Sequence, residues 1–255
     1  MPNFIDKETY EQANQELPDI DLLADRIAHL APDFISMNFK PESIFPVAGA
    51  CFQDASRTLV ESRYALLESI AHRIWYREKT NPSNELAAVF YSRFYADDTA
   101  LRLYSAAEHL AKAVVYIFNI PDSEITSKRT GSRFTTVRKI LTQEEPTHII
   151  TIAIDQLYNS KDWQETINYR DAWVHQQPPL VKGLGMGFER KKRWIQSGTN
   201  KSYKLGVGSG DEAKYSIDDL LKFILPALNQ FADTLTRVTE FYISELGKKG
   251  YSITD

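Results

Sequence analysis

The chain has 255 residues, a length that suits one large helical domain or one domain with appendages. Its composition, 43% hydrophobic and 25% charged, is that of an ordinary globular protein with a sizeable core, and its formal net charge of −4 excludes a global attraction to nucleic acid. The single cysteine, Cys51, excludes an internal disulfide framework and a cysteine-based zinc site, and it suits a reducing compartment.

The first half of the chain is predicted to be helical. Residues 1–50 are expected to form an N-terminal extension with one helix over residues 19–31, and residues 51–255 to form the main domain. Two long helices follow, over residues 53–79 and 85–119, and Asn84 is a good N-cap for the second. The apolar residues that recur at helical spacing, and that we expect to be buried, are Leu59, Tyr64, Leu67, Ile70, Ile74 and Trp75 in the first helix and Phe90, Phe94, Leu103, Leu110, Val114, Ile117 and Phe118 in the second.

Targeting signals are not expected in this chain. Residues 1–8 lack the charged-then-apolar pattern of a secretory signal, and no apolar run approaches the roughly 20 residues needed to span a bilayer. We therefore expect a soluble, cytoplasmic protein with no membrane partner.

A polar stripe runs along the second long helix. Its members recur at steps of three and four, so they share one face: Asp98, Arg102, Ser105, His109, Lys112 and Tyr116. One interpretation is a face exposed to solvent. The alternative is that part of this face binds substrate, through Arg102, Ser105, His109 and Lys112.

Further helices are predicted in the second half of the chain. A short helix is expected over residues 134–141, and another from residue 147 that breaks at residues 159–160 and resumes over residues 161–176. The final helix covers about residues 216–246, with Ser216 as its N-cap, a kink at Pro226 and an end at Gly247. The predicted fold class is all-α, a bundle of long antiparallel helices.

Residues 180–215 have the turns and the alternation of a small β-hairpin inserted between helices. A basic run within it suits an RNA backbone and a stacked base, and is therefore a candidate substrate-binding element. The alternative is a strand edge that lysines protect from aggregation. The run consists of Arg190, Lys191, Lys192, Arg193 and Trp194.

The most informative stretch is the end of the helix over residues 161–176, which two prolines terminate. Asp171 and His175 are four residues apart, so the carboxylate can reach the imidazole, and Arg170 can swing toward the same end. The negative helix end favours a protonated imidazole, and the three groups together suit phosphate chemistry. The alternative is an ordinary surface arginine and a histidine that favours a helix C-terminus. No set of His, Asp and Glu has recognisable metal spacing, so no metal or other cofactor is expected.

An arginine followed at once by a polar residue, with a histidine near a helix end, resembles the signature of the HEPN superfamily, the nucleotide-binding domains of higher eukaryotes and prokaryotes. Here that pattern is Arg170, Asp171 and His175, and Asp171 stands where asparagine is frequent in the active families. The resemblance covers about residues 53–177 and 216–246.

A second resemblance lies upstream, in residues 105–115. These residues are similar to the Ala-Ala-Glu-x-x-x-Lys-Ala stretch on an early helix of many HEPN domains, with Glu108 and Lys112 as its charged members. The same two residues also form an i,i+4 pair, which by itself stabilises a helix.

The resemblance implies a bundle that usually dimerises and joins two Arg/His motifs, and catalytic members are similar to metal-independent endoribonucleases. In that role His175 would deprotonate a ribose 2′-hydroxyl, leading to a 2′,3′-cyclic phosphate product, and Arg170 would stabilise the phosphorane. Asp171 would hold the imidazole tautomer. One histidine cannot easily also protonate the departing 5′-oxygen, so a second His175 from a homodimer mate would do so.

Two other functions fit the same residues. The fold can serve as a non-catalytic module that binds a nucleotide, an RNA or a partner protein without turnover. It can also belong to a toxin–antitoxin or phage-defence system, an expectation that family analogy alone supports.

Overall fold

The structure is a computed structural model that describes residues 4–30, 45–128, 131–175, 179–184 and 213–251 with their side chains, and the backbone of short strands between and after them. Its long helices confirm the prediction of an all-α bundle. The helices are α1 (Lys7–Gln15), α2 (Asp21–Ala28), α3 (Val47–Ile74), α4 (Glu85–Phe118), α5 (Asp122–Ser127), α6 (Arg133–Glu144), α7 (Ile149–Asn159), α8 (Lys161–His175) and α9 (Ile217–Lys248), and a π-helical turn, Trp75–Lys79, extends α3.

The described strands are short and pair two by two, all antiparallel. They are β1 (Ile35–Ser36) with β6 (Ser252–Ile253), β2 (Phe188–Glu189) with β5 (Gly208–Ser209), and β3 (Lys192–Ser197) with β4 (Asn200–Leu205). The β3–β4 pair lies in the stretch for which the sequence predicts an inserted hairpin, and its register places Arg193 opposite Lys204 and Trp194 opposite Tyr203.

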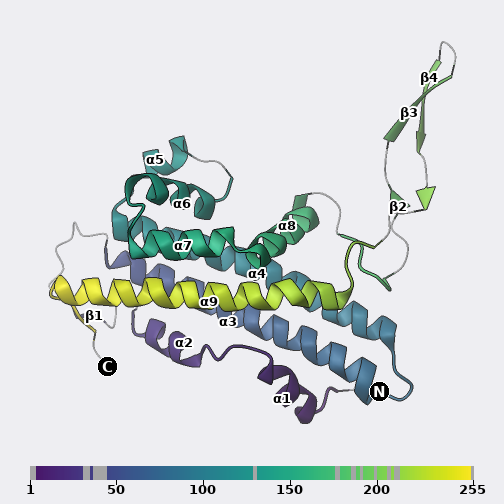
Figure 1. Ribbon diagram of the computed structural model, residues 1–255, viewed down its shortest axis with the longest axis horizontal. Coiled ribbons are helices and arrows are strands. Elements are labelled where there is room, and N and C mark those ends of the chain that lie inside the picture. Colours follow the sequence, from purple (N-terminus) through teal and green to yellow (C-terminus); the bar gives the residue numbers. More distant parts are fainter. Residues whose placement is uncertain are drawn as a thin grey trace.

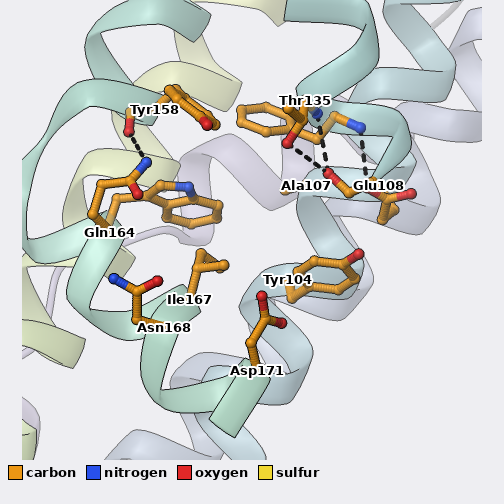
Figure 2. Close-up of a pocket in the computed structure, with 12 residues that line it drawn as sticks. Tyr104, Ala107, Glu108, Thr135, Tyr158, Gln164, Ile167, Asn168 and Asp171 are labelled. Atoms are coloured by element: carbon orange, nitrogen blue, oxygen red, sulfur yellow. Dashed lines mark hydrogen bonds between the residues drawn. The ribbon is translucent and has the colours of Figure 1, made fainter. Parts of the chain in front are cut away.

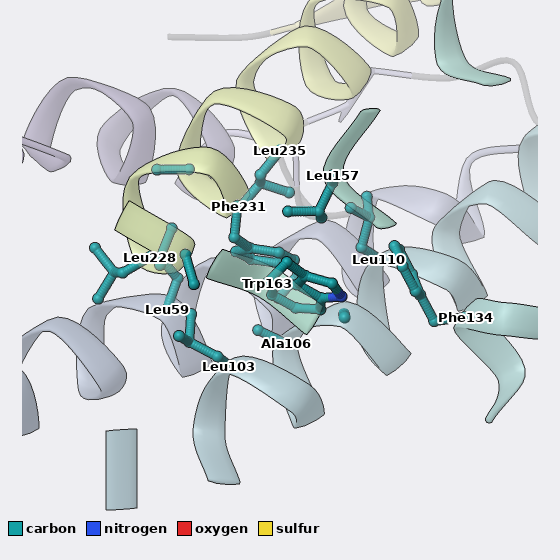
Figure 3. Packing of buried hydrophobic residues seen from close by; sticks show 14 of the residues in the cluster. Leu59, Leu103, Ala106, Leu110, Phe134, Leu157, Trp163, Leu228, Phe231 and Leu235 are labelled. Carbon is teal, nitrogen blue, oxygen red and sulfur yellow. The ribbon is translucent and has the colours of Figure 1, made fainter. Parts of the chain in front are cut away.

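Three long helices form the centre of the molecule. Figure 1 shows α9 lying alongside α3 and α4, with α1 and α2 on one side of this layer and α6, α7 and α8 on the other. Large aromatic side chains fill the junction of α6, α8 and α9, as Figure 3 shows: the Trp163 ring stacks on Phe231 and is tilted against Phe134, with centroids 5.9 Å apart in both pairs. Such rings bury much apolar area, so this junction fixes α8 firmly on α9.

Small residues form the contact between α3 and α4. Ser69 Oγ donates to the backbone oxygen of Ser92 at 2.7 Å, and Ser62 Oγ donates to that of Thr99 at 3.2 Å. All four residues are buried. Because residue 69 faces 92 and residue 62 faces 99, the two helices are antiparallel, as predicted.

Three aromatic residues that the sequence predicts to be buried are exposed. Phe90 is 56% exposed, Phe94 is 62% exposed, and Tyr64 on α3 is also exposed. Helical spacing shows that Phe90 and Phe94 share a face but not that this face is buried. In α4 the small residues that meet α3 occupy the buried face instead.

Residues of the N-terminal extension pack into the same hydrophobic core as α3 and α9. Ala13 of α1 and Ile27 of α2 are buried in that core. A Cβ atom on Gly49 would lie 2.1 Å from the backbone oxygen of Leu30, so glycine is what permits the chain after α2 to rest on the start of α3. The described part of residues 1–50 therefore shares its core with the helices that follow.

The helix ends confirm the two predicted N-caps and correct one predicted end. The Asn84 side chain accepts a hydrogen bond from Ala87 N, and Ser216 forms a reciprocal capping box at the start of α9. The prediction that Gly247 ends the last helix is wrong, because α9 runs through it to Lys248. Gly250, with φ at +79°, supplies the left-handed residue after the helix.

The segment between α8 and α9 is closed where it meets the bundle. Val181 forms a parallel bridge with Tyr215, and the Lys182 amide donates to the Tyr215 carbonyl at 2.8 Å. The Tyr215 ring in turn packs edge-on against Tyr169 of α8, with centroids 5.7 Å apart. The two ends of this segment are therefore tied to each other and to α8.

Candidate functional site

α8, which carries the predicted Arg/His motif, is anchored to α9 at its start. Ser160 Oγ accepts a hydrogen bond from Trp163 N at 3.2 Å, and it donates to Gln230 of α9 at 2.5 Å. One turn later Thr166 Oγ1 donates to the Phe223 carbonyl of α9 at 3.3 Å. These contacts fix the direction in which α8 presents its last turns.

Arg170 is held between an aromatic ring and a carboxylate. Its guanidinium lies over the Tyr104 ring of α4, 3.8 Å from the centroid, and Nη1 donates to Asp171 Oδ1 at 2.8 Å. The side chain is only 15% exposed. Among the described residues, its buried Nε has no hydrogen-bond partner. The guanidinium is therefore positioned in advance, with donors left over for a ligand.

His175 is the last residue of α8 and is exposed. The Asp171 carboxylate, which the sequence places within reach of the imidazole, binds Arg170 instead. No hydrogen bond or ion pair joins His175 to any residue in the described part of the chain. The imidazole is thus accessible, five residues and roughly 7.5 Å of helix axis beyond Arg170.

A buried polar group on α4, which the sequence did not predict, holds the end of α8 in place. Asp97 accepts a hydrogen bond from the Tyr169 hydroxyl, and Arg93 Nε lies 3.5 Å from Asp97 Oδ2. Arg93 Nη2 also donates to the Pro179 carbonyl, beyond the end of α8, at 3.1 Å. The clamp, Arg93, Asp97 and Tyr169, therefore holds the chain on both sides of His175.

The clamp carries perturbed acidities because it is buried. Burial raises the pKa of Asp97, and hydrogen bonds from Tyr169 and Trp173 and the charge of Arg93 oppose that rise. Burial also raises the pKa of Tyr169, and the adjacent Asp97 charge acts in the same direction. The Tyr169 hydroxyl therefore remains a hydrogen-bond donor at all ordinary pH values. The i,i+4 spacing of Arg93 and Asp97 was the only signal of this group in the sequence.

The Ala-Ala-Glu stretch has a structural role. Glu108 accepts hydrogen bonds from the backbone amides of Arg133 and Phe134, at 3.1 and 3.0 Å, and so caps the N-terminus of α6. The predicted partner Lys112 is exposed on α4. Glu108 thus joins α4 to α6.

Most residues of the polar stripe on α4 make contacts away from the Arg/His motif. Arg102 forms ion pairs with Asp98 and with Glu61 of α3, so two carboxylates already neutralise it. Ser105 donates to the Leu101 carbonyl at 3.1 Å, and His109 is half-buried. The α4 residue that does meet the motif is Tyr104, next to Ser105 in the chain.

The basic run is placed only through its backbone. Lys192, Arg193 and Trp194 lie in β3, whereas Arg190 and Lys191 fall outside the described residues. The side chains of the whole run are likewise outside the described part, so its role in RNA binding stays a prediction.

A pocket opens beside the motif, between α4, α6, α7 and α8 (Figure 2). Its volume is about 190 Å³. Tyr104 and Asp171 line it, and both also contact the Arg170 guanidinium. The other lining residues are Ala107, Glu108, Ser132, Phe134, Thr135, Tyr158, Trp163, Gln164, Ile167 and Asn168.

Comparisons with protein-family models, with curated proteins and with solved structures found no match. Within the described ranges, no group of three or more His, Cys, Asp and Glu side chains is arranged to hold a metal ion. None of the helices described has both the length and the apolar character needed to cross a membrane.

Proposed function

We propose that this chain is a HEPN-like, metal-independent endoribonuclease that acts as a homodimer. The observation that carries the proposal is the end of α8, where Arg170 is fixed by Tyr104 and Asp171 while His175 is exposed and unpaired within the described residues. Cleavage of RNA through its own 2′-hydroxyl requires a cation that stabilises the phosphorane and an imidazole that exchanges protons, and the last two turns of α8 carry one of each.

The reaction assigns each side chain a separate task. His175 takes the proton of the ribose 2′-hydroxyl, because an imidazole exchanges protons near neutral pH. The 2′-oxygen then attacks phosphorus, and Arg170 stabilises the added negative charge of the phosphorane. The bond from phosphorus to the 5′-oxygen breaks, leaving a 2′,3′-cyclic phosphate. Asp171 orients Arg170 in this scheme, since the carboxylate binds the guanidinium and not the imidazole.

The departing 5′-oxygen needs a proton that one His175 cannot supply while it acts as the base. A second copy of the chain, related by a two-fold axis near the end of α8, brings another His175 to the same phosphate. Exposed apolar side chains surround this corner: Trp173 and Val174 precede His175, and Phe94 lies one turn before the clamp residue Asp97. A second copy would cover them, which supports this surface as the dimer contact.

Substituting Phe94 with lysine should convert the dimer to a monomer and abolish RNA cleavage together. A buried lysine at the contact would lose its hydration without a partner, whereas in the monomer it would lie in water. Sedimentation equilibrium and the cleavage rate should be measured on the same samples. Leu22→Lys is the matched control, because Leu22 is 82% exposed on the distant α2. A Phe94→Lys monomer with full activity would rule out the shared site.

The function itself is tested by incubating the full chain with mixed RNA in EDTA. We expect products with 2′,3′-cyclic phosphate and 5′-hydroxyl ends, formed at the same rate as without EDTA. Activity that disappears in EDTA and returns with Mg²⁺ would contradict the metal-independent mechanism. Absence of cleavage under both conditions would contradict the ribonuclease.

The pocket beside Asp171 favours a second candidate, a non-catalytic module of the same fold that binds a nucleotide or an RNA. Such a module would hold RNA without converting it. Persistent binding of RNA with no product after long incubation would select it over the ribonuclease.

A further inference from the structure

The pocket of Figure 2 is placed to receive a group attached to the phosphate that Arg170 would bind. Tyr104 and Asp171 form part of its wall and at the same time contact the guanidinium, at 3.8 Å from the ring centroid and 2.8 Å from Oδ1. Its volume of about 190 Å³ is below the 300–1,000 Å³ typical of sites for drug-sized ligands. The space therefore suits a single ring system and not a whole nucleotide.

The side chains that line the pocket disfavour a phosphate inside it and favour a neutral ligand. Two carboxylates, Glu108 and Asp171, belong to the wall. None of the described residues that line the pocket is a lysine, an arginine or a histidine. The lining therefore offers an anion no cationic partner, and the phosphate of an RNA would bind outside the pocket, next to Arg170. Aromatic and aliphatic walls, including Trp163 and Ile167, provide the apolar contact that a flat ring needs.

The hydrogen bonds already made by the wall leave two side-chain acceptors unused, on Gln164 and Asp171, and the Asn168 amide nitrogen is also without a partner among the described residues. Glu108 receives two backbone amides, and Ser132 and Thr135 share a hydrogen bond between their hydroxyls at 3.0 Å. The Gln164 side-chain nitrogen donates a hydrogen bond to the Tyr158 carbonyl, and its side-chain oxygen stays available to a ligand. Asp171 Oδ1 accepts a hydrogen bond from Arg170, and Oδ2 stays available to a ligand. Unused acceptors beside an unused donor suit a ligand that carries an amino group next to a ring nitrogen, because the amino group donates and the ring nitrogen accepts.

We propose that this pocket binds a nucleobase with an exocyclic amino group, cytosine or adenine, and so selects the base next to the cleaved phosphate. The amino group donates to Gln164 and Asp171, and the ring lies against the apolar wall. Asn168 stands at the exposed mouth, where its amide meets the edge of the base. The link to cleavage rests on the proposed function, but binding of the base does not.

Titration calorimetry with nucleosides tests the pocket, because nucleosides carry no phosphate for Arg170. Wild-type protein should bind cytidine about tenfold more tightly than uridine, and adenosine about tenfold more tightly than inosine, since each second member replaces the amino group with an acceptor. Two single substitutions should each weaken the binding of cytidine and adenosine at least tenfold. They are Asn168→Leu, at the mouth, and Ala107→Leu, which fills the space. Lys161→Ala, on the exposed first turn of the same helix, is the control and should bind as wild type does.

The outcomes separate this inference from the proposed function. Binding of cytidine or adenosine without any RNA cleavage would retain the pocket and reject the ribonuclease. Cleavage with no nucleoside binding, or with equal affinity for cytidine and uridine, would reject the pocket and retain the ribonuclease. Because Asn168 is exposed, Asn168→Leu should fold even if Ala107→Leu does not, and unchanged binding by the Asn168 variant would also overturn the assignment.

Discussion

Replacing His175 with alanine is expected to lower the rate of RNA cleavage by about 10²–10⁴-fold, the usual contribution of a general acid or base. The free energy of unfolding should stay within about 0.5 kcal/mol of the wild-type value, because the side chain is exposed and makes no hydrogen bond to a described residue. Initial rates on a fluorescent RNA and urea unfolding would be measured on one preparation. His29→Ala, at the exposed C-cap of α2, controls for loss of a histidine as such and for contaminating nuclease. Equal rates for wild type and His175→Ala would remove this residue from the mechanism.

Mixtures of wild-type and His175→Ala chains show whether the site is shared. If each phosphate needs a histidine from both copies, an equal mixture at exchange equilibrium should keep about one quarter of the wild-type activity, the fraction of dimers with both histidines. If each copy acts alone, about one half should remain. The second result would contradict the shared site even if dimers are present.

Substituting Asp97 with alanine is expected to destabilise the fold by about 3 kcal/mol, because it leaves the mostly buried Arg93 without its carboxylate and the buried Tyr169 hydroxyl without its acceptor. Cleavage should fall as well, since Asp97 and Arg93 together tether both sides of His175. Urea unfolding monitored by circular dichroism measures the first effect.

Asp98→Ala is the matched control for the clamp. Asp98 is the next residue on α4 and also pairs with an arginine, but its side chain is 38% exposed. Exposed ion pairs contribute about 0–1 kcal/mol, so this variant should lose little stability and no activity. Equal losses in the Asp97 and Asp98 variants would mean that the clamp does not hold α8.

Local signals in the sequence predicted the helices well and the contacts between them poorly. Asn84 and Ser216 act as caps because a side-chain oxygen meets amides three residues away, a geometry that a short stretch of sequence contains in full. The prediction that Phe94 is buried was wrong. Spacing along α4 alone cannot show that Ser92 and Thr99, and not Phe94, face α3. Partners far apart in the chain are hidden in the same way. Asp97 meets Tyr169 across 72 positions.

The candidate site shows the same division. Arg170 and His175 were found because they stand on adjacent turns of one helix, but the partner of Asp171 was predicted as the imidazole and is the guanidinium. The Tyr104 ring, which comes from another helix, holds the Arg170 guanidinium where the Asp171 carboxylate binds it, and spacing within α8 does not reveal this contact. The pocket has no sequence signature at all, because four helices contribute to it.

The bridge between Val181 and Tyr215 has a consequence for how this protein can evolve. Since the chain leaves and rejoins the bundle at one point, lengthening the intervening segment adds only loop entropy, about 0.6 kcal/mol for each doubling. Insertions, deletions or whole replacements there leave the helical scaffold and the end of α8 intact. The segment can therefore change in length and sequence during evolution while the helices keep their arrangement.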